Sequence, residues 1–369
     1  MTARVLIAGG GIGALAAGLA LRELAPPELE LTLLSPGPEL VLAPESVLEA
    51  TGGPPAARYE LAAIAEDLGA TLVPDVLEAV DVERNRVGTR ESGLLGFDAL
   101  LVAVGARPGP VPPGALRFAG ARDAAALRGA LGSLGETPRV LFTTGAGVGW
   151  TLPLYELALL AAARHPGASI AVVTPEPRPA AVFGPVASRE VAHRLAEAGV
   201  ELRVGHVPEA FEDGRLWLAE GGSLPADLVV ALPQPAGPAI AGLPSDPHGF
   251  LPVDRFGRVL GAAGVWAAGD ATARPLKQGG LAAQQAEVAA RSIAAALGAP
   301  VEPVGYEPSL RGVLLTGDAP RFLRHTAVST VPSAASERPL WSAPGKVADA
   351  RVAHYLANHE SFRSHHEHA

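Results

Sequence analysis

Cysteine is absent from the 369-residue sequence. This absence excludes disulfides, thiolate metal sites, iron–sulfur clusters and catalysis through a cysteine nucleophile or a redox-active dithiol. Lysine is nearly absent as well, since only Lys277 and Lys346 occur. The formal net charge of −9 argues against nucleic acid as a partner and against a polybasic membrane anchor.

Long uncharged runs are scarce, and the best candidate for a membrane span or targeting segment is residues 5–21. Four glycines crowd into residues 9–13 of this run, which suits a tight turn better than a hydrophobic helix. We therefore expect a cytoplasmic protein. The chain length predicts two to three domains, and the hydrophobic content of 48% supports a large buried core.

A strand–turn–helix pattern near the N-terminus predicts a dinucleotide site. The apolar run Arg4–Ala8 predicts a buried parallel strand, and the alanine-rich run Ala14–Leu24 predicts a helix. The segment between them has the pattern G-x-G-x-x-A. Gly9 permits the tight turn, Gly11 lets the backbone approach a diphosphate, and the small Ala14 allows helix and strand to pack closely. The N-terminus of the helix then offers N–H groups to the phosphates.

The acidic residue that commonly holds the adenosine ribose is missing from this unit. A second strand is predicted at Leu29–Leu34, and Ser35 follows it where an Asp or Glu is expected. Serine offers only a neutral hydrogen bond in that place.

A second unit of the same kind is predicted further along the chain. Strands are predicted at residues 140–144 and 169–174, with a glycine-rich turn at 145–149 and a helix at 152–164. Trp150 stands where the motif needs a small third residue, so its indole should push the helix from the strand or fill the nucleotide site. Thr174 stands at the strand end where a ribose-binding acid would lie.

Two further segments carry a family resemblance. Residues 97–108 (FDALLVAVGARP) and residues 264–270 (GVWAAGD) resemble matching segments of FAD-dependent flavoproteins of the pyridine nucleotide-disulfide oxidoreductase superfamily. In that superfamily the acid that ends the later segment hydrogen-bonds the ribityl chain of FAD, which implies this role for Asp270. The resemblance implies further cofactor contacts along the same fold, at Gly13, Val76, Gly105, Gly269 and Gly280.

A long helix is predicted at residues 280–297, directly after Lys277. In the resembled flavoproteins the N-terminus of this helix points at the flavin pyrimidine edge, where its dipole stabilises negative charge on the reduced ring. Lys277 would add a formal charge there as a catalytic residue; the alternative is a surface lysine.

Within the superfamily, the chain is most similar to sulfide:quinone oxidoreductase-like and type II NADH dehydrogenase-like proteins. The segment from Leu42 to Ser46 resembles a loop that passes beside the flavin in the first group, which implies flavin contacts for Ala43 and Pro44. The thiol-dependent sulfide reaction of that group needs cysteines, and so does disulfide reduction. The Glu of NADH-using relatives is replaced by Leu152, so use of NAD(P)H stays open.

Glu156 begins an otherwise apolar stretch of the predicted second helix. A carboxylate in such surroundings can have a raised pKa and relay protons to a reduced flavin or quinone as a catalytic residue. The alternative is an acid in the first turn that complements the helix dipole.

The C-terminal region yields few predictions. By resemblance, Trp341 and Lys346 are candidates near the flavin ring. The last helical stretch shows no convincing membrane-insertion face, and the histidines near the C-terminus are interpreted as a solvated tail, with no metal site expected: His365, His366 and His368.

The sequence thus predicts an α/β protein with two Rossmann-like domains and a small cap. Residues 1–108 and 246–300 are expected to form a discontinuous FAD-binding domain, 109–245 a second NAD(P)-binding-like domain, and 301–369 a cap with a tail. The expected function is electron transfer through FAD from a small donor to a quinone-like or other small acceptor. The alternatives are an NAD(P)H:acceptor flavin reductase and a flavin- or partner-binding protein without turnover. A homodimer is left open.

Overall fold

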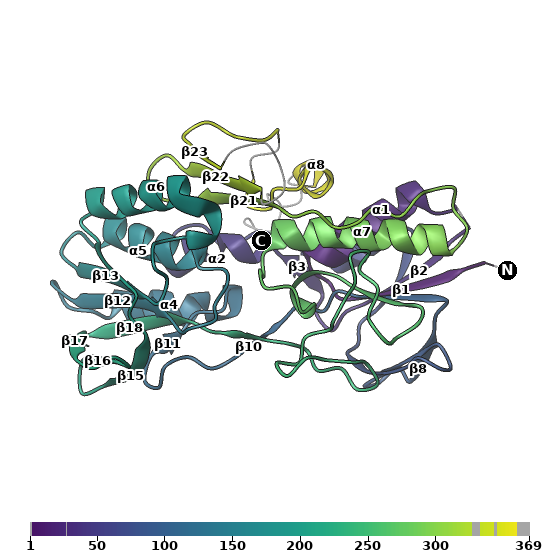
Figure 1. The fold of residues 1–369 in the computed structure, drawn as a ribbon, viewed down its shortest axis with the longest axis horizontal. Coiled ribbons are helices and arrows are strands. Elements are labelled where there is room, and N and C mark those ends of the chain that lie inside the picture. The colour runs from purple at the N-terminus through teal and green to yellow at the C-terminus, as the bar shows by residue number, and fades with distance from the viewer. Residues whose placement is uncertain (1, 27, 327–332, 343–344, 360–369) are drawn as a thin grey trace, which may run out of the picture.

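The structure is a computed structural model that describes residues 2–26, 28–326, 333–342 and 345–359. Two parallel five-stranded sheets lie side by side along the long axis of the molecule, each covered by helices, and a smaller sheet lies beside their helices (Figure 1). The predicted α/β class with two Rossmann-like units and a cap is confirmed. In the described part of the chain, no helix is both long and apolar enough to cross a membrane.

The first sheet has the strand order β20-β9-β1-β2-β5, and every neighbouring pair is parallel. Its strands are β1 (Arg4–Ala8), β2 (Glu30–Leu34), β5 (Ala70–Val73), β9 (Ala99–Val102) and β20 (Val265–Ala267). Because β20 pairs with β9, the chain leaves this sheet and returns to it more than 150 residues later.

Helices α1 (Ile12–Leu24) and α7 (Gly279–Ala296) pack together on one face of the first sheet. Both helices present alanines at their contact, and small side chains let helix backbones approach closely. The opposite face packs on a small antiparallel sheet of β6 (Leu77–Asp81), β7 (Arg86–Thr89) and β8 (Leu94–Gly96). The remaining elements of this half are β3 (Glu39–Val41), β4 (Arg58–Glu60), the 3-10 turns at Ala43–Glu45 and Gly269–Ala271, α2 (Ser46–Ala50) and α3 (Leu61–Asp67).

The second sheet has the strand order β11-β18-β12-β13-β14, again all parallel. Its strands are β11 (Leu116–Arg117), β12 (Arg139–Thr144), β13 (Ser169–Thr174), β14 (Glu201–Val204) and β18 (Leu228–Leu232). Around it lie α4 (Ala121–Gly132), α5 (Leu152–Arg164), α6 (Gly184–Glu197), the 3-10 turn Ala181–Phe183, β15 (Pro208–Glu212), β16 (Arg215–Leu218) and β17 (Ser223–Pro225). A two-stranded antiparallel ribbon of β10 (Arg107–Pro108) and β19 (Pro235–Ala236) runs between the halves (Figure 1).

The cap is an antiparallel sheet of β21 (Ser309–Leu314), β22 (Arg321–Thr326) and β23 (Ala334–Ser336), followed by α8 (Ala350–Asn358). Leucines of β21 and β22 join the core of the second half. Helix α8 buries its apolar residues Val352 and Leu356 in the core of the first half. The cap therefore packs on both halves of the molecule.

The predicted elements agree closely with the observed ones. Helix α5 and strand β13 begin and end at the predicted residues, and α1 begins at Ile12, two residues earlier than predicted. Strand β9, Ala99–Val102, lies within the segment 97–108 that carries the family resemblance. The domain boundaries at residues 108, 245 and 300 stay a prediction.

Candidate functional site

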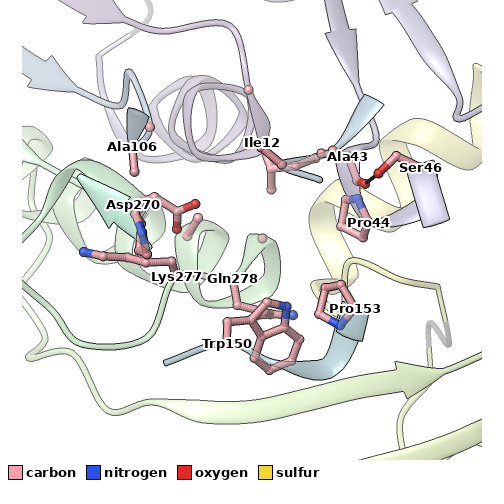
Figure 2. Close-up of a pocket in the computed structure, with 18 of the residues that line it drawn as sticks. Ile12, Ala43, Pro44, Ser46, Ala106, Trp150, Pro153, Asp270, Lys277 and Gln278 are labelled. Carbon is pink, nitrogen blue, oxygen red and sulfur yellow. Dashed lines mark hydrogen bonds between the residues drawn. The ribbon is translucent and has the colours of Figure 1, made fainter. Parts of the chain in front are cut away.

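A cavity of about 420 Å³ lies where the two halves and the cap meet. The first glycine turn and the residues around Pro44 line it from the first half, and the loop before α5 lines it from the second. Gly312, Val313 and Lys346 add a wall from the cap. Figure 2 shows Ile12, Pro44, Asp270 and Trp150 arranged around this space. Such crevices at the carboxyl ends of parallel strands are the usual ligand sites of open α/β sheets.

The first glycine turn is built for close approach. Gly9 has a φ of +138°, and a Cβ added there would lie 2.2 Å from the carbonyl oxygen of Ala103, so only glycine fits. Gly11 caps the N-terminus of α1, and a Cβ added there would meet nothing within 4 Å, because that position faces the cavity. This open cradle beside unpaired helix N–H groups fits a diphosphate.

The other predicted cofactor contacts divide into two groups. The residues that line the cavity are Gly11, Gly13, Ala43, Pro44, Gly105, Gly269 and Asp270. Those outside its lining are Gly9, Ala14, Ser35, Val76 and Gly280. Gly9 and Ala14 act through backbone geometry and packing, and Ser35 lies so close to Gly10 that a Cβ there would be 2.5 Å from the serine hydroxyl.

Helix α7 begins at the cavity, where its first residue, Gly279, and Asp270 both line the wall. Gln278 caps this helix, since its side-chain oxygen accepts from the N–H of Leu281 at 2.8 Å, and its amide nitrogen donates to the carbonyl of Arg311 at 3.3 Å. Burial raises the pKa of Asp270 to about 6, against the opposing effects of Lys277 and of the N–H of Gln278. An acceptor that is this poorly solvated favours a hydroxyl donor as its partner.

Lys277 lines the cavity, but its ammonium is held elsewhere. It donates to the carbonyl of Thr272 and lies 3.7 Å from the ring centroid of Phe250. Figure 2 shows the ammonium pointing away from Trp150 and Pro44. Burial lowers the pKa of Lys277 to about 8, opposed by Asp270 and Asp246. Its charge role stays a prediction. The N-terminus of α7, at Gly279, also lies at the cavity and contributes the positive end of a helix dipole.

Glu156 forms a buried ion pair with Lys346. The carboxylate is 1% exposed and also accepts from the N–H of Leu315 at 2.9 Å, while the ammonium donates to it and to the carbonyl of Val313 at 2.9 Å. Burial raises the pKa of Glu156, and the Lys346 ammonium opposes that rise. Both residues line the cavity. The sequence identified each as a candidate, but gave no signal that they pair across 190 positions.

Trp150 lines the cavity in a loop that differs from the first glycine turn. Seven residues, 145–151, separate β12 from α5, whereas three, 9–11, separate β1 from α1. The indole packs against Phe183 with ring centroids 5.6 Å apart. Its predicted effect on a nucleotide site stays a prediction. Pro153, in the first turn of α5, has no N–H to offer to a phosphate.

Sequence reasoning missed Glu176, two residues past the end of β13. Its two carboxylate oxygens accept from the Tyr155 hydroxyl and, at 2.9 Å, from the N–H of Ala181. Its backbone N–H donates to the hydroxyl of Thr174 at 3.2 Å. An acid does stand near this strand end, but protein groups already occupy it. The sequence signal that could have found Glu176 is an acidic residue shortly after a predicted parallel strand, here two residues beyond its end.

Trp341 does not line the cavity. Its indole contacts Phe322 edge-on, with ring centroids 5.5 Å apart. The C-terminal histidines at 365, 366 and 368 lie outside the described residues. Among the described residues, no cluster of three His, Asp or Glu side chains is arranged to hold a metal.

The chain belongs to the pyridine nucleotide-disulphide oxidoreductase family, whose model matches residues 3–292. It is a flavin-dependent oxidoreductase by family, and FAD is the cofactor of that family. No curated protein matches the chain. The cavity fits FAD at two independent points, the open cradle at Gly11 and the acceptor Asp270 in the cavity lining. The disulphide chemistry to which the family name refers is not possible in this chain, because it has no cysteine.

Solved structures of similar fold include enzymes with different partners. The sulfide:quinone oxidoreductase of the hyperthermophilic bacterium Aquifex aeolicus has a TM-score of 0.84 at 20% identity, covering 98% of this chain and 90% of that one. The ferredoxin reductase for the CYP199A2 system of Rhodopseudomonas palustris has a TM-score of 0.72 at 20% identity, covering 89% and 83%. NDH2 from Plasmodium falciparum, solved with NADH, has a TM-score of 0.72 at 12% identity, covering 89% and 91%.

Substitution of Gly11 tests the cofactor cradle. A Cβ added at Gly11 meets no protein atom within 4 Å, so the Gly11→Val protein should fold, but its side chain occupies the space that a diphosphate needs. We expect purified Gly11→Val to carry less than about a tenth of the wild-type flavin. Gly129→Val, on the exposed side of α4 and equally free of contacts, should keep full flavin. Full flavin content in a folded Gly11→Val protein would refute the placement.

Removal of one partner tests the buried ion pair. Lys346→Met leaves the Glu156 carboxylate buried without its cation, which should lower the free energy of unfolding by about 3–5 kcal/mol. Adding Glu156→Gln removes the stranded charge and should recover most of the loss. The double-mutant cycle is measured by urea unfolding. Additive effects of the two changes would show that the pair does not form.

The pKa of Asp270 predicts a local pH dependence of stability. Between pH 3.8 and about 6 the folded, flavin-free protein holds a proton on Asp270 that the unfolded chain releases. The free energy of unfolding should therefore fall as pH rises through this window, by on the order of 2 kcal/mol from this group. Asp270→Asn should remove that part of the slope. Parallel profiles for the two proteins in urea titrations at each pH would contradict the prediction.

Proposed function

We propose that this protein passes electrons through FAD from a small donor to a quinone-like or other small acceptor, without any thiol step. The observation that carries the proposal is the cavity, which combines an open dinucleotide cradle, a helix N-terminus and a buried carboxylate–ammonium pair. The neighbouring folds support electron transfer as the reaction type. The donor and acceptor classes are our inference.

Each part of the cavity has a chemical task in this proposal. The N-terminus of α1 beside Gly11 would hold the diphosphate, and Asp270 would accept a hydrogen bond from a hydroxyl of the ribityl chain. The N-terminus of α7 favours negative charge at its end of the cavity. FAD, when bound, supplies the electron-transfer chemistry itself.

Glu156 and Lys346 form the proposed proton-handling pair. Quinone reduction consumes protons along with electrons, so a buried site needs a group that can deliver them. Burial raises the pKa of Glu156, and Glu156 and Lys346 both line the cavity. A carboxyl group with a raised pKa is a suitable proton donor near neutral pH. Lys346 holds the carboxylate in position.

The cavity wall favours an apolar, flat acceptor. Most side chains that line it outside the named polar groups are apolar: Ile12, Val41, Val47, Phe118, Val148, Leu152, Leu232 and Val313. Apolar walls exclude water and favour aromatic or quinone rings over small ions. Two prolines, Pro44 and Pro153, face the space from opposite halves of the molecule (Figure 2).

An anaerobic titration separates the candidate functions. The purified holoprotein is titrated with NADH, NADPH, sulfide and a quinol, then reduced with dithionite and mixed with naphthoquinone, while the visible flavin band is followed. Rapid reoxidation by the quinone with no bleaching by either nicotinamide supports the proposal. Bleaching by NADH or NADPH selects an NAD(P)H:acceptor reductase. A flavin that no donor reduces and no quinone reoxidises indicates a binding protein without turnover.

The altered second nucleotide site gives a quantitative expectation. Trp150 fills space beside Phe183, Pro153 lacks an N–H, and Glu176 is already paired, so little remains to bind a second dinucleotide. NADH and NADPH should bind with millimolar or weaker dissociation constants, which is less than about 4 kcal/mol. Trp150→Gly should strengthen binding if any change does. Calorimetry that gives a micromolar constant for the wild-type protein would overturn this account.

A further inference from the structure

The cap sheet carries two arginines that face each other without an acidic partner. Arg311 on β21 and Arg324 on β22 are directly opposite in the antiparallel ladder. Opposed side chains in such a ladder have Cβ atoms roughly 4.5–5.5 Å apart, and like charges placed there repel. The Nε atom of each guanidinium is buried and has no hydrogen-bond partner within the described part of the chain.

A third unpartnered donor lies on the same face of this sheet. Residues alternate between faces along a strand, and Leu310, Leu314 and Leu323 face the core of the second half. Arg311, Arg324 and Phe322 therefore face the opposite way. The Trp341 indole packs against Phe322, and its N–H is buried and has no partner among the described residues.

These three groups share one property, since all are hydrogen-bond donors and none is an acceptor. Among the described residues, every buried side-chain nitrogen without a partner belongs to this cluster; the other unpartnered buried atoms are hydroxyl oxygens. Buried donors normally have partners, because leaving them unpaired is costly. A chain with a net charge of −9 has no shortage of carboxylates to supply them.

The cluster adjoins the cavity. Val313 follows Arg311 by two residues on the same face of β21 and lines the cavity, so the two side chains are roughly 7 Å apart along the strand. The backbone carbonyl of Arg311 accepts from Gln278, which also lines the cavity. Figure 1 places β21 beside α7, on the side of the sheets that carries α5 and α6.

We propose that Arg311 and Arg324, with the N–H of Trp341, bind an oxyanion group of the molecule that exchanges electrons in the cavity. The substrate class is then a flat, largely apolar ring system with a carboxylate, phosphate or sulfonate substituent. Two guanidinium groups offer a charge-assisted, multidentate site for such a group. The substrate assignment rests on the proposed function, whereas the oxyanion site itself does not.

The site is tested first without turnover. Inorganic phosphate is titrated into the holoprotein by calorimetry. The same titration is done with Arg311→Gln/Arg324→Gln and with the charge-matched control Arg122→Gln/Arg128→Gln, which changes two exposed arginines on α4. We expect binding to the wild type and to the control, and at least about a tenfold loss in the double variant. Absence of phosphate binding to the wild type, or equal binding to the double variant, would overturn the site.

Stability separates a binding role from a structural one. Because the two arginines repel and lack partners, the phosphate-free double variant should be at least as stable as the wild type. A large loss of stability in the phosphate-free double variant would contradict the proposal, since it would mean that the arginines hold the cap together.

The substrate class is tested with two acceptors that differ in one group. The dithionite-reduced holoprotein is mixed with naphthoquinone or with naphthoquinone sulfonate, and the concentration that gives the half-maximal reoxidation rate is measured. The double variant should raise this concentration at least about tenfold for the sulfonate alone. Equal effects on both quinones would refute the substrate assignment. Failure of both quinones with the wild type would count against the proposed function and leave the phosphate result to decide the site.

Discussion

The approach of the first glycine turn to the end of strand β9 fixes the geometry on which the rest of the site depends. The chain passes so close to the Ala103 carbonyl that any Cβ on Gly9 would collide with it. That contact aims the N-terminus of α1 into the space between the halves and leaves Gly11 open toward it. Strand β20 then adds to the same sheet beside β9, which brings Asp270 and the N-terminus of α7 to the same edge. The cavity is therefore a consequence of parallel strand order, because carboxyl ends of neighbouring strands meet at one edge.

A second constraint comes from charge in a dry environment. Glu156 lies on a helix whose neighbours are almost all buried, so its carboxylate needs a cation, and the cap supplies one through Lys346. The same contact closes the cavity on the cap side. Glu156 therefore has two places in this account: it is the proposed proton donor, and its ion pair joins α5 to the cap. Arg311 and Arg324 of the cap sheet differ from Lys346, because their buried Nε atoms have no hydrogen-bond partner in the described part of the chain.

Much of the fold could be predicted from the sequence. Buried parallel strands appear in it as short runs rich in Val, Ile and Leu, and glycine-rich turns follow them. The limits of α5 and β13 were predicted to the residue for that reason. Local patterns do not encode contacts between distant segments, so the pairing of Glu156 with Lys346 and the contact of Lys277 with Phe250 were not foreseen. The strands of the cap sheet were missed as well, because β21 and β22 carry charged residues and no regular alternation of apolar and polar residues marks them. Glu176 was not predicted because a ribose-binding acid is expected at the strand end itself, at Thr174, and this carboxylate lies two residues beyond it.

The central claim is that a bound flavin is the redox centre of this chain and that no protein group shares the task. The most direct measurement is an anaerobic dithionite titration of the purified holoprotein, followed by its visible absorption. Because FAD accepts two electrons and the chain has no cysteine, the flavin band should bleach completely after two electrons per chain, with no further uptake. A protein without a flavin band that cannot be reconstituted with FAD, or one that continues to take up electrons after bleaching, would contradict the account.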